Sequence, residues 1–450
     1  MAVTTRMELS GWGRYPRGLV SVQIPEKASE INLNESDRLI ARGLGRSYGN
    51  AALLNDGVVI LTERWNRSVS FCQETGLLTA ESGLTLAELL NFSLPVRWFP
   101  PVVPGTKWVT LGGCVAADIH GKNHHRQGAF GDHVQELELL GADGTRVRCS
   151  PGNNSDLFWA TVGGMGLTGI ITEVVVQLFP IENSWIIAQH HQARNLDQVL
   201  EMFDSPHWDD TYTVAWLDGL AKGKGLGRSI LIRGHHAKNA ELPESLRHGK
   251  AKQSGSRLSV KFDFPGWLLN PWTVGGFNSA YYRWQARHIQ PFPCKIDSFF
   301  FPLDRIGGWN RLYGKRGFIQ YQCVLPPQNA RAGLLRLLEE SHRGRPSFLA
   351  VLKRFGPEGK GLLSFPMEGY TLTMDFAVTD NLFPFLDRLD EIVLNQGGRV
   401  YLAKDARMRP ETFRAMYSDR LAAWSAIKKR VDPQNRFVSD LARRLEMVKG

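Results

Sequence analysis

Cysteine is scarce in this chain, with five among 450 residues, and none of them lies in a Cys-x-x-Cys pair. The five are Cys72, Cys114, Cys149, Cys294 and Cys323. Disulfide frameworks and structural zinc sites need cysteines that are even in number or closely spaced, so this pattern argues against both. We therefore expect reduced cysteines that are mostly buried.

Long hydrophobic runs are missing as well. No uninterrupted apolar segment approaches the ~20 residues that a helix needs to cross a bilayer. The N-terminal stretch MAVTTRMELSGWGRYPRG has no apolar core of the kind that a cleavable signal peptide contains. The sequence thus predicts a protein that is cytoplasmic or peripherally associated with a membrane.

Acidic residues are in deficit, since 44 Asp and Glu stand against 54 Lys and Arg and leave a net charge of +10. Such a charge favours anionic partners, whether phosphates, an anionic membrane surface or nucleic acid. One segment, from Arg247 to Pro302, is first basic (Arg247, Lys250, Lys252, Arg257, Lys261) and then aromatic (Phe262, Phe264, Trp267, Trp272, Phe277, Tyr281, Tyr282, Trp284). It is either a surface that docks on lipid headgroups or an aromatic-lined loop of a substrate domain.

The chain is long enough for two or three domains. Up to about residue 182, short strands and turns predominate, with a hairpin expected over Val134–Cys149. After that, strand-like runs alternate with helical stretches at Ala330–Arg343 and Asn381–Gln396, which predicts a sheet with helices on one face. The strand-like runs are Tyr212–Leu217, Ser229–Arg233, Phe318–Leu325, Phe348–Arg354 and Tyr370–Val378.

Two glycine-rich runs are the most informative features that are present. Residues 43–49 read Gly-Leu-Gly-Arg-Ser-Tyr-Gly, and residues 116–125 read Ala-Ala-Asp-Ile-His-Gly-Lys-Asn-His-His. Pro104-Gly105-Thr106 and Gly112-Gly113 precede the second run. Glycines allow a backbone to approach a ligand closely, and the adjacent side chains bind anions and move protons. The runs therefore predict a buried cofactor site.

The residues narrow the choice of cofactor. A literal Gly-x-Gly-x-x-Gly occurs at Gly164–Gly169, but a helical segment precedes it and the strand Ile170–Phe179 follows, which reverses the order that a Rossmann site requires. For a metal, His120 and His124 have i,i+4 spacing, yet Gly121 disfavours a helix and no carboxylate or cysteine completes a ligand set. A large dinucleotide held by several loops fits better, and we expect no metal.

These loops resemble the FAD-binding loops of the vanillyl-alcohol-oxidase-like flavoproteins, and most closely those of the decaprenylphosphoryl-β-D-ribose 2-oxidase family. The runs from His120 to His125 and from Tyr401 to Asp405 are specific to that family, and the similarity extends from Leu9 to Leu445. The resemblance implies an α+β fold with a two-subdomain FAD-binding domain and an α+β substrate domain that contains an antiparallel sheet. Residues 1–182 and 399–450 would form the FAD-binding domain, and residues 183–398 the substrate domain.

The resemblance also implies the residues that bind FAD. They are Arg42, Gly43, Leu44, Gly45, Arg46, Ser47, Tyr48, Gly49, Asn50, Pro104, Gly105, Thr110, Gly112, Gly113, His120, Gly121, Lys122, Asn123, Gly166, Gly169, Ile171 and Tyr401.

The implied reaction oxidises the ribose 2-hydroxyl of a polyprenyl-phosphoryl-β-D-ribose to a ketone, as the first half of epimerisation to an arabinose donor for cell-envelope polysaccharide. A short-chain dehydrogenase/reductase partner would complete it, and no nucleic acid is involved. Such a site must accept the hydroxyl proton or stabilise the alkoxide. Lys404 matches the active-site lysine of the family, and Tyr48 and His120 are the next candidates. The implied substrate-binding residues are Gln320, Gln322, Lys353, Thr371, Thr373 and Lys404, with Lys353 facing the substrate phosphate.

Two residues depart from the family pattern. Thr373 stands where mycobacterial members carry a pocket cysteine, and Thr371 replaces an amide side chain. Covalent inhibitors aimed at that cysteine should not attach here. Two other functions stay open: a soluble sugar or aldonolactone oxidase of the same superfamily, and a basic nucleic-acid- or membrane-binding protein without catalysis, although no known nucleic-acid motif is present.

Many members of the superfamily attach FAD covalently through a histidine that follows the Gly-x-Gly of the first loop, and Arg46 occupies that position here. Because a guanidinium cannot form that bond, we predict that FAD is held non-covalently. Acid precipitation of the yellow protein should leave the colour in the supernatant. A pellet that stays yellow after washing would contradict the prediction.

Overall fold

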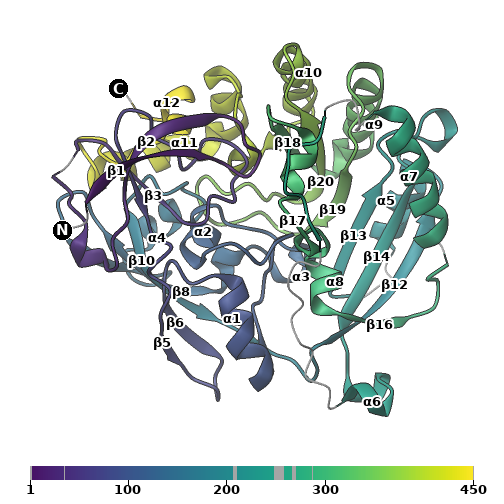
Figure 1. Cartoon of the computed structure of the whole chain (residues 1–450), viewed down its shortest axis with the longest axis horizontal. Helices are drawn as coiled ribbons and strands as arrows, with labels where there is room; N and C mark the ends of the chain where they lie inside the picture. Colours follow the sequence, from purple (N-terminus) through teal and green to yellow (C-terminus); the bar gives the residue numbers. More distant parts are fainter. Residues whose placement is uncertain are drawn as a thin grey trace.

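The computed structural model describes residues 3–34, 36–205, 210–247, 258–265, 270–285 and 287–448. Lys250, Lys252, Arg257 and Trp267 of the basic and aromatic segment lie outside the described residues. The first third of the chain and the C-terminal segment lie on one side of the molecule, and a large sheet with its helices lies on the other (Figure 1). None of the described helices combines the length and apolar character needed to span a membrane.

The N-terminal part contains two sheets. The first has the strand order β1-β2-β4-β3, with β1 (Thr4–Ser10), β2 (Arg17–Gln23), β3 (Leu39–Arg42) and β4 (Val58–Leu61). Strand β4 is buried along its whole length between two parallel neighbours, which explains its continuous run of Val, Ile and Leu. The second sheet is antiparallel, in the order β5-β6-β10-β8-β9, with β5 (Ser68–Phe71), β6 (Leu77–Glu81), β8 (Val134–Leu140), β9 (Arg146–Cys149) and β10 (Ile170–Gln177).

Short helices lie between these strands in the chain, and two of them flank the second glycine-rich run, whereas the first run follows β3. The helices are α1 (Leu86–Ser93), α2 (Leu111–Ala116), α3 (His124–Gln127) and α4 (Ser155–Thr161). The run Gly164–Gly169 lies between α4 and β10, so helix precedes strand as the sequence indicates, and the hairpin of β8 and β9 is confirmed. Two-residue strands β7 (Trp98–Phe99) and β11 (Phe179–Pro180) pair with each other, as do β15 (Leu258–Ser259) and β17 (Ile306–Gly307).

The middle of the chain forms an eight-stranded antiparallel sheet in the order β16-β12-β14-β13-β19-β20-β18-β21. Its strands are β12 (Trp185–Ala193), β13 (Tyr212–Leu217), β14 (Ser229–His236), β16 (Phe292–Lys295), β18 (Phe318–Leu325), β19 (Ala350–Phe355), β20 (Gly369–Ala377) and β21 (Arg399–Val400). Helices α5 (Leu196–Asp204), α9 (Pro327–Gly344) and α10 (Leu382–Asn395) cover its outer face (Figure 1). The five predicted strands and both predicted helices are therefore present.

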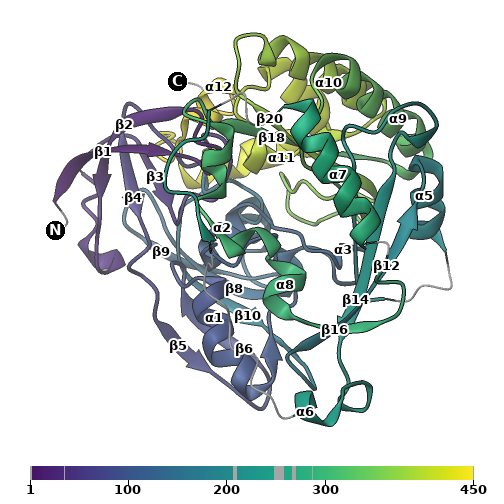
Figure 2. The same cartoon turned by 45° about the vertical axis from the view of Figure 1, so that its right-hand side comes forward.

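Part of the basic and aromatic segment is helical, so the expectation of a loop is wrong there. Helix α7 spans Pro271–Gln285 and packs near β14, in front of the sheet in Figure 2. Its two adjacent glycines, Gly275 and Gly276, weaken the helical pattern in the sequence. The short helices α6 (Glu244–Arg247) and α8 (Ile296–Phe300) flank it in the chain.

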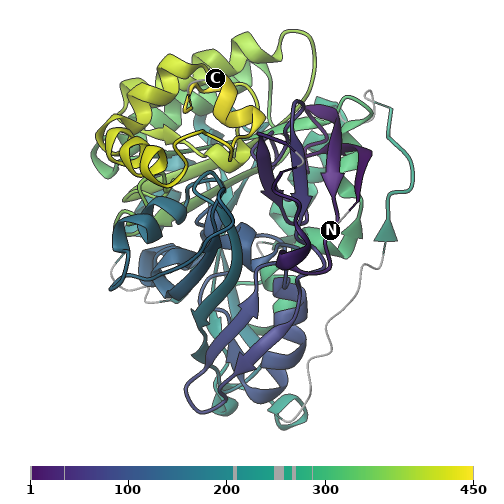
Figure 3. The same ribbon diagram turned by 90° about the vertical axis from the view of Figure 1, so that its left-hand side faces the viewer.

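The C-terminal segment packs against the N-terminal part. After β21 the chain forms α11 (Pro410–Val431) and α12 (Asp440–Arg444), which lie beside the N-terminal strands (Figure 3). Phe437 is fully buried in a cluster with Leu39 and Trp65, and the backbone N–H of Val438 donates to the carbonyl of Leu39 at 3.0 Å. These contacts agree with an FAD-binding domain that is split in sequence, while its limits at residues 182 and 398 stay a prediction.

Candidate active site

Two segments from opposite ends of the chain meet at the centre of the molecule. We call residues 43–50, which follow β3, the first loop, and residues 401–405, which follow β21, the Lys404 segment. The backbone N–H of Tyr48 donates to the carbonyl of Ala403 at 2.9 Å. This bond brings the side chains together, and the Nζ atom of Lys404 lies 3.7 Å from the centroid of the Tyr48 ring.

Strands β18 and β20 form the wall that faces this pair. Their register places Gln320 opposite Asp375 and Gln322 opposite Thr373. Tyr321 points the other way and donates its hydroxyl proton to α10 on the outer face. Because side chains alternate along a strand, the predicted residues Gln320 and Gln322 share the inner face, as the sequence spacing requires. Gln320 donates to the carboxylate of Asp375 at 2.8 Å.

His120 joins the second glycine-rich run to this wall. The side-chain amide of Gln322 lies 2.9 Å from His120 Nε2 and also donates to Thr371 Oγ1 at 3.1 Å. With the amide as donor, His120 Nε2 is the acceptor and Nδ1 carries the proton. Burial and the charge of Lys353 hold the pKa of His120 well below its usual value, so the ring is neutral. Its Nδ1 is buried and has no hydrogen-bond partner in the described part of the chain.

Three lysines converge on the same space. Burial lowers the pKa of Lys122 to about 7, that of Lys353 to about 8 and that of Lys404 to about 7. The charge of Asp375 opposes the effect on Lys404, whereas Lys353 adds to it. All three side chains keep a partly accessible surface although they lie deep in the protein, so they line an internal space. Lys122 also donates to the carbonyl of Phe299.

The glycine-rich loops surround this space in a way that fits FAD. An added Cβ on Gly43 would lie 2.2 Å from Thr110 Oγ1, and Gly45 has a φ of 61°, so both positions need glycine. Gly105 is exposed, and an added Cβ there would meet nothing within 4 Å, so close packing does not require glycine at this position. Together with the unpartnered Nδ1 of His120, these features match a site for a large ligand with polar edges.

Other residues predicted to bind FAD stabilise the loops. The guanidinium of Arg42 is buried and donates to the carbonyl of Ser10 at 2.6 Å, and Asn123 donates to the carbonyl of Pro101 at 2.8 Å. Tyr401 packs beside His120, with ring centroids 5.2 Å apart. The remaining predicted residues lie in three places. Leu44, Arg46, Ser47, Gly49 and Asn50 are in the first loop, and Pro104, Gly112, Gly113 and Gly121 are in or before the second glycine-rich run. Gly166 and Gly169 lie between α4 and β10, and Ile171 is on β10. Their contacts with FAD stay a prediction.

The sequence reasoning missed two residues, Asp375 in the wall and Tyr313 beside it. Asp375 accepts from Gln320 and, at 3.3 Å, from the hydroxyl of Tyr313. A signal for Asp375 was present, because it follows Thr371 and Thr373 at a spacing of two on one strand. No signal pointed to Tyr313, which comes from a turn of 3-10 helix (Trp309–Tyr313) outside the sheet.

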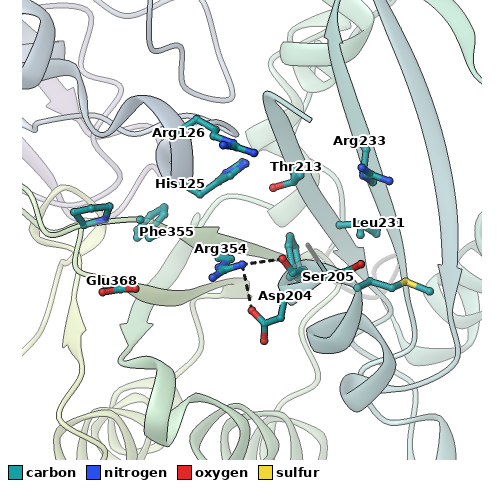
Figure 4. A pocket seen from close by; sticks show the side chains of 14 residues that line it. His125, Arg126, Asp204, Ser205, Thr213, Leu231, Arg233, Arg354, Phe355 and Glu368 are labelled. Carbon is teal, nitrogen blue, oxygen red and sulfur yellow. Dashed lines mark hydrogen bonds and ion pairs between the residues drawn. The ribbon is translucent and has the colours of Figure 1, made fainter. Parts of the chain in front are cut away.

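A separate cavity of about 310 Å³ lies next to this site, and its lining includes His125 from the second glycine-rich run (Figure 4). Phe355 lines the cavity, and its ring centroid is 4.8 Å from that of His120. Arg354 points into the cavity and forms an ion pair with Asp204 at 3.3 Å. Arg233 forms an ion pair with Asp210. Because these cations are matched by carboxylates, the cavity lacks the excess positive charge that surrounds Lys404.

Comparison with known proteins agrees with this geometry. A family described as "FAD binding domain" matches residues 26–150, which include both glycine-rich runs. A solved structure, a variant of Physcomitrella patens BBE-like 1, superposes with a TM-score of 0.64 over 93% of this chain and 90% of that chain, at 15% identity, and shows the fold. The chain is an FAD-dependent oxidoreductase with the vanillyl-alcohol-oxidase type of fold.

Relatives that match over most of the chain identify the family more specifically. Decaprenylphosphoryl-beta-D-ribose oxidase of Mycolicibacterium smegmatis is 40% identical over 99% of this chain and 98% of that protein. The chain belongs to the decaprenylphosphoryl-β-D-ribose oxidase family. An uncharacterized Streptomyces coelicolor protein is 35% identical over 80% of the chain and all of its own length. A putative D-arabinono-1,4-lactone oxidase of Neurospora crassa is 21% identical over 93% of the chain, and the family described by that activity matches residues 373–445.

Proposed function

We propose that this chain uses FAD to oxidise the ribose 2-hydroxyl of a polyprenyl-phosphoryl-β-D-ribose to the 2-keto sugar. One observation carries the proposal: Lys404 and Tyr48 are in contact inside the space between the predicted FAD loops and strands β18 and β20. A relative that is 40% identical over nearly the whole chain is named as an oxidase of such a lipid-linked ribose, which supports the substrate class.

The reaction removes a hydride from carbon 2 and a proton from its hydroxyl. FAD, when bound, supplies the hydride acceptor. Lys404 takes the proton, because burial lowers its pKa to about 7 and leaves much of the side chain as the free amine near neutral pH. Burial and the charge of Asp375 keep the pKa of Tyr48 well above its usual value, so Tyr48 remains a phenol that can hydrogen-bond the same oxygen.

The remaining charges suit a phosphate-bearing substrate. Lys353 lowers the pKa of His120, Lys122 and Lys404 through repulsion between like charges in a buried space. A phosphate beside Lys353 would relieve this repulsion, and a neutral sugar would not. We therefore assign Lys353 to the substrate phosphate. The polar side chains of Gln320, Gln322, Thr371 and Thr373 line the wall and are proposed to contact the sugar.

Oxidation to the keto sugar would be the first half of an epimerisation. A second hydride must be added to the opposite face of carbon 2 to give the arabinose epimer. We propose that a partner reductase of the short-chain dehydrogenase class performs that step.

A second candidate is an oxidase of free sugars or aldonolactones. It is favoured by the match of residues 373–445 to the D-arabinono-1,4-lactone oxidase family, because this range contains Lys404. The two functions differ in the need for a phosphate, and therefore in the part played by Lys353.

The substrate class can be tested by anaerobic bleaching of the flavin absorbance. We expect a synthetic polyprenyl-phosphoryl ribose to bleach the flavin, and free ribose, arabinose and arabinono-1,4-lactone to leave it oxidised under the same conditions. Bleaching by the lactone alone would favour the second candidate. A folded protein that contains no flavin at all would contradict both.

Lys404→Met should slow flavin reduction by about 10²- to 10⁴-fold while FAD stays bound, because the thioether cannot accept a proton. Methionine is close to lysine in length and preserves the packing on Tyr48. Stopped-flow reduction by the lipid-linked ribose measures the rate, and the flavin-to-protein absorbance ratio reports FAD content. Lys360→Met, at an exposed lysine outside the site, is the matched control. Equal rates for Lys404→Met and the unmodified enzyme would remove Lys404 from the reaction.

We further propose that α7 contacts an anionic membrane surface, from which a polyprenyl-linked substrate has to be drawn. Trp272, Phe277 and Trp284 are 90%, 63% and 55% exposed, although large apolar side chains are usually buried. Phe277 and Trp284 are seven residues apart and so share one face of the helix. Arg283 lies on the same helix, and cations beside exposed aromatics favour anionic headgroups.

Sedimentation with vesicles tests this contact. The protein should bind vesicles of phosphatidylcholine and phosphatidylglycerol, with weaker binding at high salt, and the triple variant Trp272→Ser, Phe277→Ser, Trp284→Ser should lose most of it. The matched control replaces exposed apolar residues on the opposite end of the fold, Met7, Leu19 and Val69, by serine. Binding that is unchanged in the α7 variant, or equally reduced in the control, would show that α7 is not the contact.

A further inference from the structure

We infer that Asp375 is a positioning residue for the oxidation, which orients Gln320 and governs the charge of Lys404. This inference rests on the proposed role of Lys404 and adds a residue that the proposed function does not use. Asp375 lies on β20 opposite Gln320 of β18, and no contact with a substrate is assigned to it.

Asp375 is held rigidly. It is 1% exposed, and both carboxylate oxygens are engaged, one by Gln320 at 2.8 Å and the other by the Tyr313 hydroxyl at 3.3 Å. Its backbone N–H donates to the hydroxyl of Ser347 at 3.0 Å, and that hydroxyl donates to its carbonyl at 3.2 Å. The carboxylate therefore has one orientation, set by β18, by the 3-10 turn and by the loop before β19.

This orientation fixes how the side chain of Gln320 is turned. An ionised carboxylate only accepts, so Gln320 must turn its NH₂ group toward Asp375 and its carbonyl oxygen away. Against the larger effect of burial, Gln320 also acts on Tyr48 and lowers its pKa, as an amide N–H turned toward the phenol oxygen does. The ring of Tyr48 lies against Lys404. Asp375 also holds Tyr313, which stacks on Phe318. Phe318 packs edge-on against Tyr48, with ring centroids 5.4 Å apart, so these contacts connect Asp375 to the phenol and the amine.

Asp375 also acts on Lys404 through its charge. The groups whose charges act on Lys404 are Asp375 from β20, which raises its pKa, and Lys353 from β19, which lowers it. The groups that face Asp375 are Gln320 from β18, Tyr313 from the 3-10 turn, Tyr48 from the first loop and Lys404 itself. Burial raises the pKa of Asp375 to about 7, against the hydrogen bond from Gln320 and the charge of Lys404. The carboxylate and the amine therefore each favour the charged form of the other.

The sign of the expected change follows. Asp375→Asn keeps the shape of the side chain and removes its negative charge, so Lys404 should give up its proton at lower pH. The rate of flavin reduction rises with pH as Lys404 becomes a free amine. The midpoint of this rise should therefore move to lower pH in Asp375→Asn, by on the order of one pH unit. Lys353→Met removes a repelling cation and should move the midpoint to higher pH.

The experiment measures Lys404 in two ways in the FAD-loaded enzyme. The first measurement is the rate of single-turnover flavin reduction by saturating polyprenyl-phosphoryl ribose as a function of pH, which gives the midpoint of the rise. The second is competitive labelling of Lys404 by acetic anhydride as a function of pH, read by mass spectrometry, which gives the titration of Lys404 in the absence of substrate. Asp375→Glu retains the charge and should restore the midpoint. Tyr313→Phe, which keeps the ring stacked on Phe318 at 4.2 Å, removes only one donor to Asp375 and should give a smaller shift to lower pH. It serves as the test if Asp375→Asn does not fold.

The outcomes separate the two claims. Unchanged midpoints in both measurements for Asp375→Asn, with only a slower rate, would show that Asp375 merely supports the fold and would overturn the inference. A wild-type enzyme whose flavin the lipid-linked ribose does not reduce would overturn the proposed function, and the labelling of Lys404 would still decide whether Asp375 controls its charge.

Discussion

The active site depends on one backbone junction, at which the first loop is held against the Lys404 segment. At Gly49 the two backbones are so close that an added Cβ would lie 1.8 Å from the carbonyl oxygen of Asp405. Burial opposes the ionisation of Asp405, but Arg444 and Arg407 outweigh it and lower its pKa. Because Arg444 belongs to α12, the C-terminal helix fixes the position of Lys404 relative to the N-terminal loop. The proposed proton acceptor and the predicted cofactor loops are thereby positioned by the same contact.

The electrostatics of the site follow from burial of several cations in one space. Each of Lys122, Lys353 and Lys404 loses hydration there, and their repulsion adds to the cost of holding charge. Asp375 compensates only part of this charge. A site of this kind favours an anion, and it supplies a free amine at neutral pH, so that the proposed proton transfer does not need a histidine as the base.

Features of the site that depend on residues close together in the sequence could be predicted, and those that depend on residues far apart could not. Strands β18 and β20 were predictable because alternation within each strand identifies its two faces, and the glycine-rich runs were predictable because glycine marks close backbone approach. Lys404 was found only through resemblance to a family, since nothing local distinguishes it from a solvated lysine. Asp375 and Tyr313 were missed because their partners depend on strand pairing and on a turn 62 residues away. Helix α7 was missed because its glycines and aromatic residues obscure the helical period.

The polar cluster in the wall of the site adds little to stability, which supports the functional role proposed for it. Strand β18 is buried along its whole length, yet it carries Gln320 and Gln322 among apolar residues. A buried amide without partners costs about 1–3 kcal/mol, whereas apolar residues of similar shape at both positions would be nearly neutral. Both amides have found partners in Asp375, Thr371 and His120, so the network offsets its own desolvation and contributes little further stability. We attribute its presence in β18, which lies next to the edge strand β21, to what it is proposed to hold in place, namely His120 beside Lys404.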